Sequence, residues 1–142
     1  MEIRIRKARL DDAEAIALLS KDLGYEPHKD EIVRKLQKFE LNPGEEIFVA
    51  EFEKVVGWMH ISLVEPLESD PFAEIRGIVV AEEYRGKGMG TKLIQSAEEW
   101  TRRKNCKKIR IRTNMKREDT RKYYRNLNFT SIKLQEVFEK KI

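Results

Sequence analysis

The sequence predicts an α/β fold in which one mixed, mostly antiparallel sheet is flanked by helices. Segments with the two-residue alternation of a strand recur along the chain, and segments with helical spacing of apolar residues fall between them. Their order, β-α-α-β-β-β-α-β-α-β, is typical of one α/β domain. The 142 residues contain no repeat, linker or low-complexity segment, so we expect a single domain over residues 1–142.

The first part of the chain predicts one strand and two helices. Residues 2–7 alternate isoleucine with charged side chains, as a half-buried strand does. One of the two aspartates at 11–12 is a suitable N-cap for the next helix, which ends at Gly24. A second amphipathic helix spans residues 32–39, and the Asn-Pro-Gly sequence at 42–44 breaks it.

The middle of the chain predicts three consecutive strands. Residues 47–53 and 55–64 are rich in β-branched and aromatic residues, and their close spacing predicts an antiparallel hairpin. Gly57 indicates a bulge or a close approach of two backbones. After an acidic loop over 65–71, residues 72–80 form a long and largely apolar run, which we expect to be a central strand.

The last third predicts a helix, a strand, a second helix and a final strand. Apolar side chains at helical spacing mark residues 89–100 as the first helix. Residues 108–113 alternate isoleucine with basic residues and predict a strand, and a short helix is expected over 120–127. We expect residues 129–138 to form a strand that closes the sheet.

Composition favours a globular, highly charged protein, for which the cytoplasm is the expected location. Charged residues make up 38% of the chain and hydrophobic residues 40%. No apolar run approaches the ~18 residues that a membrane span requires, and the N-terminus lacks a signal-peptide core. The single cysteine, Cys106, excludes an internal disulfide, and we expect it to be buried and inert. No metal site is expected.

The charge is unevenly distributed along the chain. Residues 1–84 carry 11 basic and 19 acidic side chains, whereas residues 85–142 carry 18 basic and 6 acidic ones. The basic half suits an anionic ligand and the acidic half a cationic one, although solvated surfaces with a chance asymmetry would look the same. The basic run over 102–108 lacks interleaved aromatic residues for base stacking, so we expect neither nucleic acid nor a membrane as partner.

The most informative motif is Arg85-Gly86-Lys87-Gly88-Met89-Gly90, between a predicted strand and a predicted helix. Such a turn lets backbone N–H groups approach a phosphate, and the start of a helix favours negative charge. The motif does not complete the Gly-x-Gly-x-x-Gly pattern of dinucleotide-binding folds, and it lacks the Gly-Lys-Ser/Thr of a P-loop. The alternative is a tight connection that binds no ligand.

The motif and its flanks, residues 79–90, resemble the acetyl-CoA-binding signature of the GNAT superfamily of N-acetyltransferases. A second segment, Tyr123-Tyr124-Arg125-Asn126-Leu127-Asn128-Phe129, resembles the family's Phe-Tyr-x-x-x-Gly-Phe block. The predicted element order also matches the GNAT fold over nearly the whole chain, and the sequence looks most similar to the aminoglycoside-type and small-amine branches. The resemblance implies acetyl-CoA as co-substrate and a homodimer as a candidate assembly.

The resemblance also implies which residues hold acetyl-CoA. The end of the strand over 72–80 would hydrogen-bond the pantetheine arm through its backbone, and the glycine turn would surround the pyrophosphate, assisted by the charges of Arg85 and Lys87. Arg117 stands where many members have asparagine, so either Asn114 replaces that contact or Arg117 meets a phosphate of CoA. The predicted cofactor-binding residues are Ile78, Val79, Val80, Arg85, Gly86, Lys87, Gly88, Met89, Gly90, Thr91, Asn114 and Arg117.

Two residues are predicted to be catalytic by the same resemblance. The tyrosine that matches Tyr124 can protonate the leaving thiolate, and a phenol with an ordinary pKa near ~10 is a suitable acid. Glu74, in Phe72-Ala73-Glu74-Ile75, matches a general base of histone-acetyltransferase-type members. The alternatives are a core tyrosine, and a glutamate that faces solvent or pairs with Arg76, with water accepting the proton. His60 and His28 are expected to be structural.

The resemblance predicts transfer of an acetyl group to a primary amine by direct attack in a ternary complex. The acidic residues Glu26, Asp30, Glu31, Glu65, Glu68 and Asp70 favour a cationic acceptor, either a small molecule or a protein amine. Asn128 replaces the glycine of the family block, and asparagine tolerates the left-handed conformation that this position requires. The alternative function is a GNAT-fold module that binds acyl-CoA without catalysis.

Overall fold

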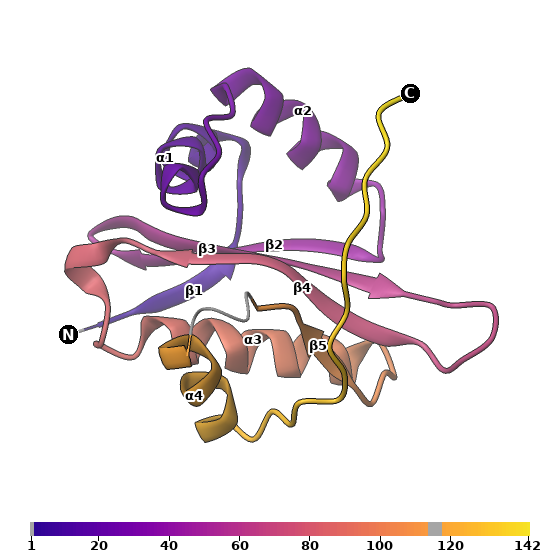
Figure 1. Ribbon diagram of the computed structural model, residues 1–142. Coiled ribbons are helices and arrows are strands. Elements are labelled where there is room, and N and C mark those ends of the chain that lie inside the picture. The colour runs from indigo at the N-terminus through magenta and orange to yellow at the C-terminus, as the bar shows by residue number, and fades with distance from the viewer. Residues whose placement is uncertain (1, 114–117) are drawn as a thin grey trace. The chain divides into compact units, whose positions relative to one another are not determined.

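The computed structural model describes residues 2–113 and 118–142, which form two compact units within 1–112 and 113–142. The first unit holds the sheet and helices α1, α2 and α3, and the second holds helix α4 (Figure 1). None of the helices in these residues is both long and apolar enough to cross a membrane.

One five-stranded sheet runs through the first unit in the order β1-β2-β3-β4-β5. The strands are β1 Arg4–Lys7, β2 Glu45–Phe52, β3 Lys54–Val64, β4 Phe72–Val80 and β5 Ile109–Ile111. The first three junctions are antiparallel and the β4–β5 junction is parallel, which confirms the predicted mixed sheet. A parallel pair needs a crossover connection, and α3 supplies it.

The β2–β3 hairpin turns at Glu53, which has a positive φ of 64°. A register shift between Ala50 and Glu51 pairs Ala50 with Gly57. A Cβ atom at Gly57 would lie 2.9 Å from the carbonyl oxygen of Val79 on β4, so only glycine allows the two strands to come this close. The prediction for Gly57 is confirmed in both of its forms, because a bulge lies beside it and the β4 backbone approaches it.

Helices cover both faces of the sheet. Helices α1 (Ala13–Leu19) and α2 (Lys29–Glu40) lie on one face, and α3 (Met89–Arg103) lies on the other (Figure 1). The helical turn that follows α1 ends at Gly24, whose φ of 86° gives the left-handed cap that the sequence predicts. The predicted helix over 89–100 is confirmed and extends three residues further.

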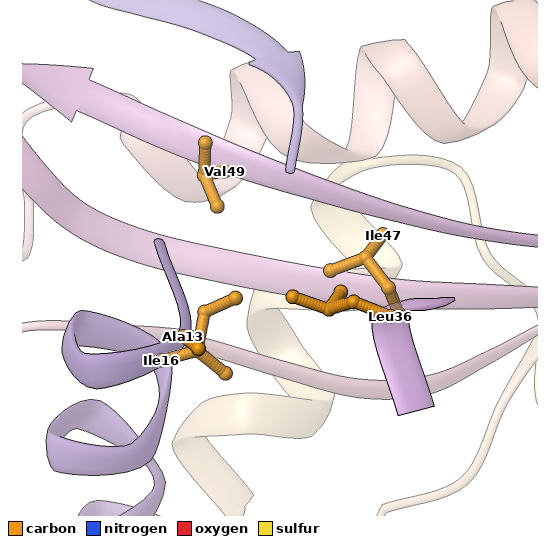
Figure 2. Close-up of a cluster of buried hydrophobic side chains, with 5 residues drawn as sticks. All are labelled: Ala13, Ile16, Leu36, Ile47 and Val49. Atoms are coloured by element: carbon orange, nitrogen blue, oxygen red, sulfur yellow. The ribbon is translucent and has the colours of Figure 1, made fainter. Parts of the chain in front are cut away.

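Two apolar layers hold these helices on the sheet. Figure 2 shows the layer under α1 and α2, which is built from Ala13, Ile16, Leu36, Ile47 and Val49. On the opposite face, α3 buries Leu93, Ala97 and Trp100 at helical spacing. Burying one leucine contributes about 1.5–3 kcal/mol, so this stripe fixes the position of α3 and of its first turn.

The second unit contains α4 (Glu118–Asn126), followed by residues 127–142 without helix or strand. The short helix predicted over 120–127 is confirmed, but the strand predicted over 129–138 is wrong. Its alternation suits a strand, yet a strand also needs a neighbour for its backbone hydrogen bonds, and the described residues provide none. The apolar side chains of this segment are exposed: Ile132, Leu134, Val137 and Phe138.

Candidate functional site

Strand β4 has an open edge over its second half. The short strand β5 pairs only with residues 73–75, so residues 76–80 have no β5 neighbour within the described part of the chain. The parallel ladder ends because β5 itself ends at Ile111, short of the strand predicted over 108–113. An unpaired strand edge offers N–H and C=O groups to another extended chain.

The alternation of the backbone decides which amides face this edge. The N–H of Ala81 donates to the carbonyl oxygen of Val56 on β3, at 2.8 Å. Because successive peptide N–H groups point to opposite sides of a strand, those of Ile78 and Val80 face the open edge, whereas that of Val79 faces β3. Among the three predicted strand residues, Ile78 and Val80 therefore present their N–H groups to a ligand.

The glycine turn joins this strand end to the start of α3. Gly86 and Gly88 have φ values of 76° and 87°, and a Cβ atom at either position would meet nothing within 4 Å. Glycine is therefore needed for the backbone conformation, and the space above it is open. Helix α3 starts at Met89, and its N-cap residue Gly88 supplies no side-chain hydrogen bond. The N-terminus of a helix favours an anion through its backbone N–H groups and its dipole. These features fit a phosphate group.

The two charged side chains of the turn have different contacts. Nε of Arg85 donates to the carbonyl oxygen of Val80 at 2.9 Å, and its Nη2 lies 3.2 Å from the Asp22 carboxylate. Arg85 thus ties the turn to the strand end and to the segment after α1. The Lys87 ammonium lies 5.6 Å from the centre of the Tyr84 ring, and the Lys87 side chain is exposed. No pattern in the sequence identifies Asp22 as the partner of Arg85.

Glu74 is buried on β4, with both carboxylate oxygens bonded to arginines. Oε2 accepts from Nη1 of Arg76 and Oε1 from Nε of Arg112, each at 2.7 Å. Glu74 itself is 5% exposed. The predicted partner Arg76 is confirmed. Arg112 was not predicted as a partner, because the basic alternation over 108–113 does not show which of its arginines reaches Glu74.

Glu45 and His60 form a second pair on the face of the sheet that α1 and α2 cover. Nε2 of His60 lies 3.0 Å from Oε1 of Glu45 and 3.4 Å from Oγ of Ser62. The Phe39 ring of α2 lies next to the imidazole, with 5.0 Å between the ring centres. Burial lowers the pKa of His60 below its ordinary value, although the hydrogen bond with Glu45 acts in the opposite direction.

Tyr124 lies on α4 in the second unit. Its ring stacks on Tyr123 at 5.5 Å and meets the edge of Phe129 at 5.6 Å. Burial, with a smaller contribution from Tyr123, raises the pKa of Tyr124 to about 12. The expected ordinary pKa is therefore wrong, because the phenolate would be poorly solvated in this position. The phenol holds its proton throughout the neutral range.

The other predicted residues have varied positions. Asn114 and Arg117 lie outside the described residues. Thr91 is in the first turn of α3. Asn128 has a φ of 69°, which confirms that asparagine takes the left-handed conformation there. Cys106 is buried, as expected, with Sγ 3.3 Å from the carbonyl oxygen of Pro71.

Sequence comparison gives the family directly. The model of the acetyltransferase (GNAT) family matches residues 9–129. An uncharacterised N-acetyltransferase from Chlorobaculum tepidum is 33% identical over 95 residues, which are 66% of this chain and 57% of that protein. The matched region thus spans little more than half the length of that relative.

Solved structures share the fold over the whole chain. The aminoglycoside antibiotic 6'-N-acetyltransferase AAC(6')-Ih from Acinetobacter baumannii has a TM-score of 0.82 and 19% identity, over 99% of each chain. AAC(6')-Iy, in complex with the bisubstrate analogue CoA-S-monomethyl-acetylneamine, has a TM-score of 0.86 and 20% identity, over 100% of each chain. At these identities the likeness concerns the fold.

The family match includes every element that carries the candidate site. It spans β4 with its open edge, the glycine turn, α3 and the helix that holds Tyr124. The predicted glycine turn between a strand and a helix is confirmed, and the structure adds that Gly86 and Gly88 have positive φ and that the helix has no side-chain cap. The chain belongs to the acetyltransferase (GNAT) family.

Proposed function

We propose that this protein transfers an acetyl group from acetyl-CoA to a primary amine. The observation that carries the proposal is the continuity between the open edge of β4 and the glycine turn at the start of α3. An extended arm that ends in phosphates fits such a path, because one end supplies strand-like hydrogen bonds and the other supplies N–H groups for an anion. Family membership supports the same donor.

Each part of the donor has matching groups in the first unit. The edge amides of Ile78 and Val80 would pair with the pantetheine arm, and the N–H groups of the turn with the pyrophosphate. Gly86 and Gly88 leave room there, and Lys87 supplies a positive charge. Arg85 contributes less positive charge to the phosphates, because its guanidinium is already bonded to the Asp22 carboxylate. Acetyl-CoA supplies a thioester, and an edge N–H would stabilise the negative charge that develops on its carbonyl oxygen.

The acceptor amine must be neutral when it attacks. Its lone pair forms the new N–C bond, the C–S bond breaks, and the thiolate takes a proton. We propose that Tyr124 gives this proton, because its phenol stays protonated at neutral pH. Holding the two substrates in one complex supplies a further large part of the rate.

The proton that the amine loses needs an acceptor. Glu74 stays a prediction for this role. The arginine hydrogen bonds on both of its oxygens compete with a third proton donor, which favours water as the first acceptor.

The acceptor is proposed to be a small cationic amine. The acidic side chains named in the sequence analysis are exposed in the first unit, where they would attract such a molecule. Two fold relatives also point to small amines: one is named for aminoglycosides, and the other was solved with an acetylneamine analogue.

Release of free thiol from acetyl-CoA in the presence of an amine panel tests the proposal. We expect turnover with at least one polyamine or aminoglycoside. Tyr124→Phe should lower kcat by on the order of 100-fold, because a general acid typically contributes that much or more. Tyr123→Phe, its stacked neighbour, is the matched control and should keep most of the activity. Binding of acetyl-CoA without turnover of any amine would contradict the proposal and favour a non-catalytic acyl-CoA-binding module.

A further inference from the structure

The Glu45–His60 pair is a mostly buried polar contact that remains accessible to solvent. The side chains of His60 and Glu45 are 20% and 18% exposed, and their closest atoms lie 3.0 Å apart. The Phe39 ring and the Ser62 hydroxyl also lie beside the imidazole. A histidine whose only role was to fill space would not need a carboxylate beside it, since burying that carboxylate costs free energy.

The contact with Glu45 determines which nitrogen of His60 carries the proton. A carboxylate can only accept, so Nε2 donates and the neutral ring keeps its lone pair on Nδ1. Burial is the main reason that the pKa of His60 is lowered. The charged groups facing the ring are Glu45 on β2, Arg76 on β4 and Lys35 on α2, and the two cations lower the pKa further. At neutral pH the ring is therefore an uncharged proton acceptor.

His60 also lies next to the end of β4 that the proposed function uses. In the β3–β4 ladder, His60 pairs with Gly77, and the preceding residue Met59 pairs with Ile78, where the open-edge amides begin. The Cα atoms of directly paired residues in antiparallel strands lie about 5 Å apart. His60 is thus within one residue pair of the backbone that would hold the acetyl end of the donor.

We infer that His60, held by Glu45, receives the proton that the acceptor amine loses; this inference rests on the proposed acetyl transfer. One N–H bond of the acceptor ammonium breaks, its proton passes through water, and an N–H bond forms at Nδ1 of His60. The amine keeps the electron pair that makes the new bond to the acetyl carbon. Glu45 stabilises the resulting imidazolium, which then releases the proton to solvent.

The test is the pH dependence of kcat/KM in His60→Gln, with acetyl-CoA as donor and neamine and spermidine as acceptors. Glutamine can still donate a hydrogen bond to Glu45, but it does not titrate. The other histidine of the chain provides the matched control. His28 is exposed and its ring accepts the N–H of Asp30, a cap that asparagine in His28→Asn can replace. Circular dichroism checks the fold, and His60→Asn is measured in the same way if the glutamine variant does not fold.

We expect His60→Gln to lose on the order of 100-fold in kcat/KM near neutral pH. Most of this loss should disappear at about pH 10, where a primary amine gives up its proton to solvent unaided. His28→Asn should follow the unmodified protein at every pH. A loss in His60→Gln that is the same at every pH, or no loss, would overturn the inference while leaving acetyl transfer in place. If the unmodified protein acetylates no amine, the proposed function itself fails, and the inference fails with it.

Discussion

Glu74 and Glu45 are both glutamates on strands of the same sheet, yet their surroundings suit opposite tasks. Glu74 is bonded through both oxygens to guanidinium groups that stay positively charged at any working pH. Glu45 is bonded to an imidazole that can gain and lose a proton near neutrality. The first arrangement holds a fixed charge in place, and the second lets a proton move.

The comparison shows that the type of residue alone does not identify a general base. Glu74 has the position in the sequence that the family resemblance points to, whereas His60 looks like an isolated strand histidine. The two sites are distinguished only by the partners of their carboxylates, which are two arginines for Glu74 and His60 for Glu45. A base needs a lone pair that no permanent cation already occupies, and in the first unit that condition is met better by His60 than by Glu74.

The largest effect should come from removing the charge of Glu74. Glu74→Gln keeps the size of the side chain but leaves Arg76 and Arg112 without their shared carboxylate. We expect the free energy of unfolding in urea to fall by about 2 kcal/mol, as for other buried hydrogen bonds to charged groups. Glu45→Gln, whose carboxylate is partly exposed, should lose under about 1 kcal/mol. Equal losses in the free energy of unfolding would show that the two carboxylates contribute equally to stability, which would contradict this comparison.

A smaller effect is expected when the support of His60 is weakened. Glu45→Gln leaves a neutral amide where the imidazolium needs a negative charge, so kcat/KM at neutral pH should fall by about tenfold, which is about 1.4 kcal/mol. The double variant Glu45→Gln/His60→Gln should lose little more than His60→Gln alone, because both changes remove the same proton acceptor. If the losses in kcat/KM of the two single variants multiply in the double variant, Glu45 does not act through His60.

The smallest effect concerns stability against pH. Because burial places the folded-state pKa of His60 below its ordinary 6.5, the unfolded chain takes up this proton at a higher pH than the folded protein does. The contribution of the neutral His60 to the free energy of unfolding is therefore complete above pH 6.5, and it is lost as the pH falls below that value. In thermal unfolding between about pH 7 and pH 5, His60→Gln should therefore lose less stability than the unmodified protein. His28→Asn should show the full decline, and a decline identical in all three proteins would contradict the assignment.

Much of the first unit could be predicted from local patterns. The strand Phe72–Val80 is found with the bounds that its apolar run indicates, and Gly24 and Gly57 have the roles that their positions predict. These features depend on neighbours in sequence or on one face of one element. The terminal segment over 129–138 was predicted wrongly for the complementary reason, since its alternation gives a strand pattern but specifies no pairing partner.

The hydrogen-bonded pairs of charged and polar side chains depend on the register between neighbouring strands, which a short sequence pattern does not specify. Counting outward from the hairpin turn at Glu53 places Glu46 opposite His60. The bulge beside Ala50 shifts the register by one residue, so that Ile47 lies opposite His60 and Glu45 lies diagonal to it on the same face. A one-residue shift thus decides which glutamate meets the histidine.

The partners of Glu74 required the same kind of knowledge on the other side of the sheet. The parallel register pairs Glu74 with Arg110, and Arg112 reaches the carboxylate from two residues further along the chain. In an antiparallel arrangement the same basic alternation would have run past Glu74 in the opposite direction. The sequence therefore indicated a buried glutamate that needed partners, but it identified only the nearer arginine.

The most direct test of acetyl transfer follows the acetyl group itself. Acetyl-CoA carrying an isotopic label in its acetyl group is incubated with the protein and a panel of primary amines, and the products are analysed by mass spectrometry. We expect labelled acetyl on the nitrogen of at least one amine, with an equal amount of free CoA. Intact labelled acetyl-CoA and unmodified amines throughout the panel, from a protein that binds acetyl-CoA, would contradict it.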